Sequence, residues 1–226
     1  MPSRRTPGRD AITLDRIVDT ALALVRTEGY EAVSMRRVAT ALDTGPASLY
    51  AHVANKRDLD QEMLGRLVRD LPVPAPDPDR WREQVIELSR QMRDLYVGHP
   101  GLARAVFAVV PTHPDLVRMS EGMLAIMLAG RLSPQSAAWG IDLLALYITG
   151  YCYEQSLWVA QYADAKDSLD DLRERFEALP AEDFPLTHQH LDELMSGEEG
   201  DRFDYGIACI LQGISTVTPQ VTTRLA

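Results

Sequence analysis

Four prolines at alternate positions divide this chain into two parts of unequal length. Pro72, Pro74, Pro76 and Pro78 each lack a backbone N–H donor, and each favours an extended conformation in the residue before it. The stretch is therefore incompatible with a helix or a central strand, and we expect an extended linker. It separates a shorter segment, residues 1–70, from a longer one, residues 80–226, which we expect to be two domains.

The two parts also differ in charge. Residues 1–57 contain nine Lys and Arg against six Asp and Glu, a net charge of +3, whereas residues 58–226 carry −13. The net charge of the whole chain, −10, argues by itself against a nucleic-acid partner. A basic head on an acidic body instead predicts that only the head meets phosphate. Arg4, Arg5 and Arg9 further predict that residues 1–11 form an arm with phosphate or minor-groove contacts.

The sequence gives no sign of export or of a membrane partner. No run of residues is long and apolar enough to span a bilayer, and Asp10 and Asp15 interrupt any signal-peptide core. We therefore expect a cytoplasmic protein. Cys152 and Cys209 lie far apart in apolar contexts, which favours buried free thiols over a metal site or a disulfide.

Residues 1–70 carry helix signals at short intervals. Thr13 precedes six apolar residues at helical spacing, and Gly29 follows them as a helix end. Ser34 is a good N-cap for a second, short helix that we expect to end near Leu42. Asn55, with an aspartate three residues later, predicts the start of a further helix.

A tight turn is expected between the second helix and a third. Residues 43–45 (Asp-Thr-Gly) favour a turn, and Pro46 suits the first position of a helix that we expect to run to about Val53. Two short helices joined by such a turn are typical of a helix-turn-helix that binds duplex DNA. Leu49 and Val53 would pack inward. The outer, DNA-facing side would then consist of Thr44, Pro46, Ala47, Ser48, Tyr50 and His52.

Helical periodicity alone does not separate this motif from a purely structural three-helix bundle. The basic residues that flank it favour DNA, with Arg36 and Arg37 on one side and Lys56 and Arg57 on the other.

Residues 80–226 are helical in pattern throughout, with no strand alternation and no internal repeat. We therefore predict an all-α fold, a helix-turn-helix head joined to a larger helical body. The expected helices of the body span 80–97, 101–109, 114–131, 134–162, 168–178, 187–196 and 202–213. The helix over 134–162 is apolar around most of its circumference, so we expect a core on one side and a subunit interface on another. With the helix over 202–213 it would form a four-helix interface in a homodimer.

Two runs of residues resemble a known family. Residues 34–42 (Ser-Met-Arg-Arg-Val-Ala-Thr-Ala-Leu) and 48–59 (Ser-Leu-Tyr-Ala-His-Val-Ala-Asn-Lys-Arg-Asp-Leu) closely resemble the signature of the TetR family of bacterial repressors. The Leu-Tyr-x-His-x-x-x-Lys run is its specific part. The body is similar to the tetracycline-repressor branch at Trp81, 98–101 (Gly-His-Pro-Gly), 110–112 (Val-Pro-Thr) and 202–206 (Arg-Phe-Asp-Tyr-Gly).

The resemblance implies roles for particular residues in and beside the motif. Arg36 would contact a base edge, most naturally guanine, which arginine binds through two hydrogen bonds. Phosphate contacts that fix the register would come from Ser34, Tyr50, His52 and Lys56. The floor of the major groove would be met by Pro46, Ala47 and Ser48, which can contact a thymine methyl or read shape.

The sequence departs from the family at two places. Asp43 stands where many members have glycine in the turn, but aspartate tolerates a left-handed conformation. The segment around Ala105, Val106 and Phe107 lacks the histidine with which tetracycline repressors hold the magnesium of the drug. This departure from the family argues against a metal–tetracycline inducer, and we predict no metal site and no cofactor.

Aromatic and methionine side chains of the body indicate where a largely apolar small molecule could bind. The aromatic residues of helix 134–162 could line a pocket or belong to the core, and the methionines of helix 114–131 could form the opposite wall or pack as ordinary helix contacts. His99 could be a pocket residue or a helix-end cap. The segment 164–177 is most simply a solvated face, although the resemblance implies a cover over the pocket. The predicted ligand residues are His99, Phe107, Met119, Met123, Trp139, Tyr147, Tyr151 and Gln155.

These features together predict a transcriptional repressor that binds a pseudo-palindromic DNA operator as a homodimer and is released by a small-molecule inducer. Two alternatives remain open. One is an enzyme with a helical active site, for which the sequence offers no catalytic residues: no paired carboxylates, Ser/His/Asp set or metal-ligand spacing. The other is a nucleoid-type or activating DNA-binding protein without a ligand.

Overall fold

The computed structural model describes residues 11–161, 165–198 and 200–220. Within these ranges the chain is all-α and contains no strand, as the sequence predicts. The head contains α1 (Leu14–Glu28), the 3-10 turn η1 (Tyr30–Ala32), α2 (Met35–Ala41), α3 (Pro46–Leu49) and α4 (Lys56–Val68). The body contains α5 (Trp81–Val97), α6 (Ala103–Ala108), α7 (Pro114–Ala129), α8 (Pro134–Gln161), α9 (Ala165–Glu177), α10 (Pro185–Gln189), α11 (Leu191–Met195) and α12 (Asp201–Thr216).

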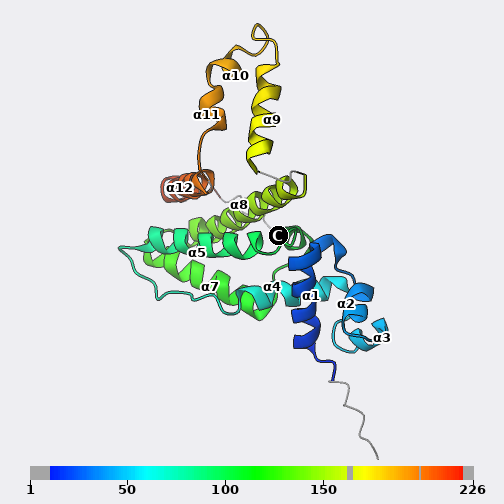
Figure 1. The fold of residues 1–226 in the computed structure, drawn as a ribbon. Helices are drawn as coiled ribbons and strands as arrows, with labels where there is room; N and C mark the ends of the chain where they lie inside the picture. The colour runs from blue at the N-terminus through cyan, green and yellow to red at the C-terminus, as the bar shows by residue number, and fades with distance from the viewer. Residues whose placement is uncertain (1–10, 162–164, 199, 221–226) are drawn as a thin grey trace, which may run out of the picture.

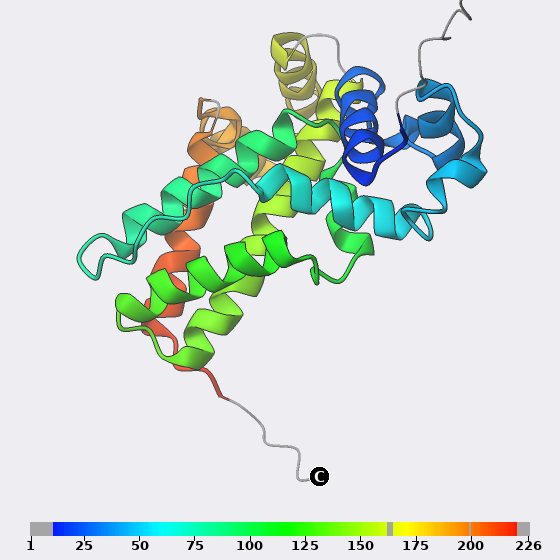
Figure 2. The same cartoon turned by 90° about the horizontal axis from the view of Figure 1, so that it is seen from below.

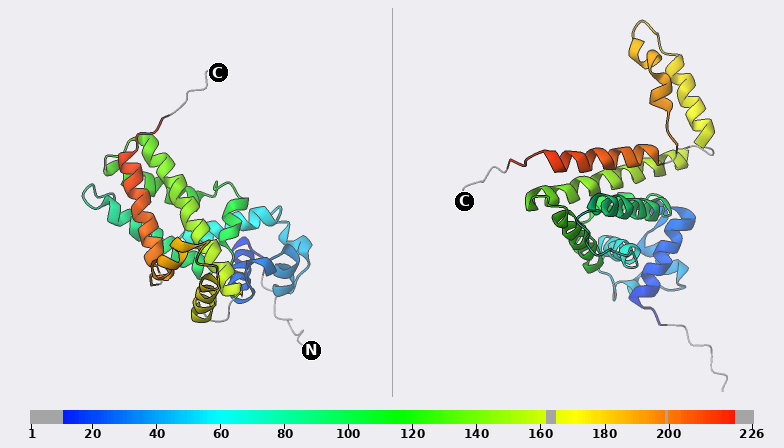
Figure 3. Two further views of the ribbon diagram at one scale, coloured as in Figure 1. Left: turned by 90° about the horizontal axis from the view of Figure 1, so that it is seen from above. Right: turned by 90° about the vertical axis from the view of Figure 1, so that its left-hand side faces the viewer.

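The helices form a small head, a layered body and a projecting hairpin. Figure 1 shows α1, α2 and α3 grouped at one end, with α4 leading from them to α7. Helices α8 and α12 lie side by side as an outer layer, behind which α5 and α7 pack (Figure 3). Helices α9 to α11 extend away from this layer and pack mainly on one another.

Side-chain caps fix where the head helices begin. Thr13, Ser34 and Asn55 each accept, through a side-chain oxygen, a hydrogen bond from the amide three residues later, at 3.3, 3.1 and 3.1 Å. Each bond satisfies an N–H that has no partner inside its helix. The three predicted N-caps are thus confirmed, as is the end of α1 at Gly29, whose φ is 81°.

The turn between α2 and α3 adopts the conformation that its residues favour. Asp43 has φ 51°, the left-handed region that aspartate tolerates, and the amide of Thr44 donates to the carbonyl of Ala39 at 2.9 Å. Pro46 is in the first turn of α3, as predicted. Leu49, the last residue of α3, is fully buried, so the other residues of this helix face outward.

Helix α3 is shorter than predicted. Regular helix ends at Leu49 rather than near Val53, because the amides of His52 and Val53 both bond to the carbonyl of Leu49, at 2.9 and 3.0 Å. This tight turn reverses the chain so that Asn55, with φ −163° and ψ 179°, can cap α4. Val53 is nevertheless buried, as the inward packing predicted for it requires.

The proline-rich linker is extended but not loose. Figure 2 shows residues 69–80 running beside α5 without helical structure. Gln84 of α5 holds the linker at two points: its Nε2 donates to the carbonyl of Ala75 at 2.7 Å, and its Oε1 accepts from the amide of Asp77 at 3.0 Å. Val73 packs so closely on Gly122 of α7 that an added Cβ there would lie 2.2 Å from it.

Helix α8 has a buried side and an exposed side. Leu144, Ile148 and Cys152 are buried against the body, whereas Leu143 and Leu146 are exposed. Both cysteines are free, as predicted. The prediction that both are buried is wrong for Cys209, because it lies on the outer side of α12, away from the face by which that helix packs on α8.

The hairpin differs from the prediction in one element. The single helix expected over 187–196 is two short helices, because His190, with φ −116° and ψ 25°, interrupts the helical backbone between α10 and α11. Arg202, in the first turn of α12, donates to the carbonyls of Leu194 and Ser196 at 2.6 and 3.3 Å, which fixes the end of α11 to the body.

We expect Leu49→Ala to lower the free energy of unfolding by about 2–5 kcal/mol, because it removes a fully buried side chain whose site cannot collapse completely. Urea titration followed by circular dichroism measures this. Leu186→Ala is the matched control, since Leu186 of α10 is 69% exposed and its loss should cost less than about 0.5 kcal/mol. Equal losses for the two variants would contradict the burial assigned to Leu49.

Candidate functional site

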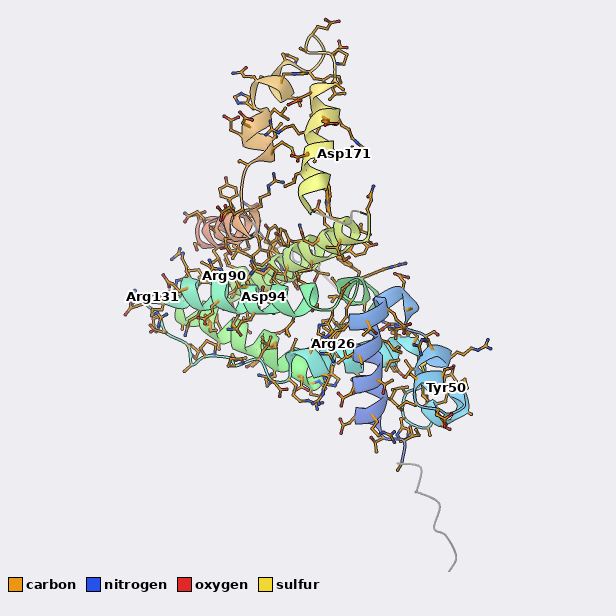
Figure 4. The ribbon with its side chains drawn as sticks, in the orientation of Figure 1. Arg26, Tyr50, Arg90, Asp94, Arg131 and Asp171 are labelled. Atoms are coloured by element: carbon orange, nitrogen blue, oxygen red, sulfur yellow. The ribbon has the colours of Figure 1, made fainter. Side chains whose placement is uncertain are left out.

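The predicted DNA-contacting residues of the head differ in how far they are exposed. Tyr50, at the far end of the head in Figure 4, is 53% exposed. The other exposed members of the set are Ser34, Arg36, Pro46, Ala47 and His52. The half-buried members are Thr44, Ser48 and Lys56. None of the nine is buried, and their contact with DNA stays a prediction.

The tip of α3 is small and internally braced. Thr44 donates through Oγ1 to Oγ of Ser48 at 3.0 Å, which joins the turn to the helix that follows it. Pro46 and Ala47 project little beyond the backbone, so the first turn of α3 can approach a groove floor closely. A slim element with a polar border is what entry into the major groove requires.

Two neighbouring arginines on α2 differ in whether their guanidinium groups have a hydrogen-bond partner. The guanidinium of Arg37 is held by Glu28 of α1, with Nε to Oε2 at 3.1 Å, and this hydrogen-bonded pair lowers the pKa of Glu28. Arg36 is exposed, and its guanidinium forms no hydrogen bond or ion pair within the described part of the chain. Arg36 therefore has its full set of donors available to a partner.

Lys56, the first residue of α4, is less free than its predicted role suggests. Its ammonium is ion-paired with Asp60 one turn later and lies 4.1 Å from the centre of the Tyr30 ring. The side chain of Lys56 as a whole is 32% exposed, so these contacts do not bury it.

The head and the body meet along α4 and η1. The amide of Tyr30 donates to the carbonyl of Pro100 at 3.0 Å, and Glu31 is ion-paired with Arg104 of α6. Gln61 of α4 donates through Nε2 to the carbonyl of Val110 in the α6–α7 connection. A cleft of about 450 Å³ opens at this junction, lined by Tyr30, Glu31, Val33, Lys56, Arg104, Phe107 and Ala108.

Two of the predicted ligand residues belong to an aromatic cluster in the body. The rings of Tyr147 and Tyr151 lie 6.3 Å apart, and both contact Phe203 of α12, at 5.7 and 5.1 Å. The hydroxyl of Tyr147 donates to the carbonyl of Arg202 at 2.9 Å. The guanidinium of Arg93 lies 4.9 Å from the centre of the Phe203 ring, so the cluster has a cationic border.

The structure does not bring the other predicted ligand residues into one group. Met119 and Met123 are buried on α7, and Gln155 is half-buried on α8. Phe107 is 54% exposed, lines the head–body cleft and makes an edge contact with Tyr153. Trp139 is 44% exposed on the outer side of α8. Their predicted contact with a ligand stays a prediction.

His99 is buried next to the head. Burial lowers the pKa of its imidazole, and Arg26 of α1, labelled in Figure 4, lowers it further. Its Nδ1–H donates to the carbonyl of Leu95 at 2.7 Å. Nε2 is buried without a hydrogen-bond partner in the part of the chain that the structure describes. It is therefore an acceptor available to another group.

Sequence reasoning missed four residues of these two sites: Tyr30, Asp60, Arg93 and Phe203. Asp60 carried a signal, since it follows Lys56 by four positions on the same helix. Phe203 also carried one, as the first member of the apolar stripe of α12 that continues with Ile207 and Leu211. Tyr30 and Arg93 reach their partners across the fold, which no local pattern reveals.

The described residues contain no group of three or more His, Cys, Asp or Glu side chains placed to hold a metal ion. None of the helices in those ranges is long and apolar enough to cross a membrane.

The comparison with known proteins covers nearly the whole chain. Residues 17–63 match the family described as "Bacterial regulatory proteins, tetR family", and residues 73–218 match "Tetracyclin repressor-like, C-terminal domain". The HTH-type transcriptional repressor DrrR1 of Streptomyces coeruleorubidus is 29% identical over 226 residues, which cover 96% of this chain and 83% of that protein.

Solved structures agree with the sequence matches. ActR of Streptomyces coelicolor in complex with actinorhodin has a TM-score of 0.81 and 36% identity, covering 91% of this chain and 96% of that one. ActR in complex with (S)-DNPA has a TM-score of 0.79 at the same identity, covering 90% and 97%. Since the second family alone matches more than half of the residues, this chain belongs to the TetR family of bacterial regulatory proteins.

Proposed function

We propose that this chain is a ligand-responsive transcriptional repressor that binds a pseudo-palindromic operator as a homodimer and is released by a small-molecule inducer. The observation that carries the proposal is the pairing of a small, outward α3 tip with the unengaged guanidinium of Arg36. Residues 1–70 act as the DNA-binding domain and residues 80–226 as the regulatory domain. The arm proposed for residues 1–11 lies almost entirely outside the described residues.

The exposed side of the α8–α12 layer supports the homodimer. Trp139, Leu143 and Leu146 of α8 recur at helical spacing and are exposed, beside Tyr205 and Cys209 on α12. An apolar surface of this kind is costly to leave in water, and a second copy of the same two helices would cover it as a four-helix interface. The two heads would then reach successive major grooves about 34–36 Å apart.

The aromatic cluster of the body supports a ligand that is largely apolar. Tyr147, Tyr151 and Phe203 offer ring faces, while His99 offers a buried acceptor nitrogen elsewhere in the body. ActR, at 36% identity, has been solved with actinorhodin and with (S)-DNPA. A ligand that binds the body better in a conformation with wider-spaced heads would lower DNA affinity by the ratio of its two affinities.

Two other functions are less well supported. An enzyme would need a set of catalytic residues. The family to which this chain belongs is described as regulatory proteins, which favours a regulator over an enzyme. A DNA-binding protein without a ligand would share the head but would not be released by any small molecule. Release of the DNA by a small molecule therefore distinguishes a repressor that responds to a ligand from a DNA-binding protein without one.

The role of Arg36 can be tested on an operator selected by the wild-type protein from a randomised duplex library. Arg36→Ala should lose about 1–3 kcal/mol of binding free energy on that operator and relax the preference at one base position. Fluorescence anisotropy measures the affinities, and a second selection measures the preference. Arg37→Ala is the control, because Glu28 already holds Arg37, and it should keep the base preference. An equal loss on random DNA would refute base recognition by Arg36.

The dimer can be tested by sedimentation at micromolar concentration, where we expect twice the mass of one chain. Leu146→Asp places a charge on the exposed stripe of α8 and should shift the protein to monomer. Val117→Asp, on the exposed side of α7, should leave the mass unchanged. A wild-type protein that sediments as a monomer would contradict the proposed homodimer.

The inducer can be sought by screening a metabolite library that includes actinorhodin against the operator complex. At least one compound should release the DNA, and the same compound should raise the melting temperature of the free protein, since a ligand stabilises the state that binds it. If no compound of a broad library does so, the DNA-binding protein without a ligand becomes the better interpretation.

A further inference from the structure

Lys56 is a cation at a place where helix physics disfavours one. It is the first residue of α4, and the N-terminus of a helix carries a partial positive charge that disfavours a lysine there. Lys56 forms an ion pair with Asp60, four residues later in the same helix. A pair at this spacing stabilises a helix less when the basic residue comes first than when the acidic residue does. Helix stability therefore does not explain why the ammonium is held there.

The ammonium is nevertheless held from two sides. Asp60, which is only 3% exposed, forms an ion pair with the ammonium through Oδ1. The other carboxylate oxygen of Asp60 accepts a hydrogen bond from the Tyr30 hydroxyl at 3.0 Å. The ring of the same tyrosine lies 4.1 Å from the ammonium nitrogen. A buried carboxylate is costly unless all its oxygens are paired, so the three side chains depend on one another.

Tyr30 is itself fixed by the body. Its amide donates to the carbonyl of Pro100, and its Cβ would lie 3.3 Å from a Cβ at Gly101, which has φ +80°. Burial, with Asp60 next to it, raises the pKa of Tyr30, so the hydroxyl keeps the proton that it donates. The Tyr30 ring that the ammonium contacts is thus held rigidly, because Tyr30 contacts both the head and the body.

We propose that Asp60 and Tyr30 are positioning residues that hold the Lys56 ammonium in place for a DNA phosphate. The inference rests on the proposed function and adds these two residues to its binding surface. An ammonium has three N–H donors, and with one directed to Asp60 the others remain for a phosphate oxygen on the exposed side. A lysine held in this way loses less side-chain entropy on binding than a free one.

The competing interpretation is that Tyr30 and Asp60 merely stabilise the head. Both interpretations predict weaker DNA binding when the tyrosine hydroxyl is removed. They differ in what happens once Lys56 is gone, because a positioning residue acts only through the residue that it positions, whereas a stabilising residue acts regardless. A double-mutant cycle separates the two.

The experiment measures binding of the full-length chain to a random-sequence duplex as a function of salt, since phosphate contacts do not depend on sequence. Lys56→Ala should weaken binding and reduce the slope of log K against log salt by about one. Tyr30→Phe, which keeps the ring and the net charge, should weaken binding about two- to tenfold in the wild type. In the Lys56→Ala background the same change should have no further effect.

Two more variants keep the test decisive if Tyr30→Phe has a small effect. Tyr30→Leu removes the ring as well and should cost more than Tyr30→Phe, again only when Lys56 is present. Thr112→Val is the matched control: it removes the hydroxyl that Gln61 contacts at 3.3 Å in the same head–body junction, without touching Lys56, and should leave DNA binding unchanged.

The possible failures are distinguishable. If Lys56→Ala binds as well as the wild type, the phosphate contact in the proposed function is wrong. If Lys56→Ala is weakened but the tyrosine variants reduce affinity by the same factor in both backgrounds, only the positioning inference is overturned. An unchanged affinity for both Tyr30→Phe and Tyr30→Leu would overturn it as well.

Discussion

The arrangement of this molecule depends on α4 being packed on two sides at once. One side contacts α1 in the head, and the other contacts α6 and α7 in the body. Gly65 makes the second contact possible, since an added Cβ would lie 2.1 Å from Nδ1 of His113. Arg118 of α7 then donates to the carbonyls of Val68 and Arg69, at 2.8 and 2.9 Å, where α4 ends. Because close-packed surfaces do not deform continuously, the head cannot turn against the body without repacking α4.

Local interactions are what the sequence predicted well. Thr13, Ser34 and Asn55 each satisfy an amide only three residues away, so the information needed to place them lies within a single turn. Asp43 is a similar case, since its left-handed φ is a property of the residue and its immediate turn. The outward position of Tyr50 and the burial of Leu49 followed from helical spacing alone.

Contacts across the fold were beyond such reasoning. The end of α3 at Leu49 coincides with a tight turn in which the amides of His52 and Val53 share the Leu49 carbonyl, and helical periodicity does not reveal such a turn. The Tyr30–Asp60 hydrogen bond joins residues thirty positions apart, and Phe203 meets Tyr147 and Tyr151 only because α12 lies beside α8. Periodicity could assign each of these residues to a helix face, but it could not say which faces meet.

Arg36 and Lys56, the two cations of the head that are predicted to contact DNA, are held in physically different ways. Arg36 lies on α2 with its guanidinium unengaged, so its position is set by the helix-turn-helix alone. Lys56 is bound through Tyr30 to Pro100, and hence to the connection between α5 and α6 of the body. In the proposed function, the first contact supplies base preference and the second supplies affinity for phosphate. A ligand that displaces the α5–α6 connection would then act first on the strength of DNA binding and leave the preferred sequence unchanged.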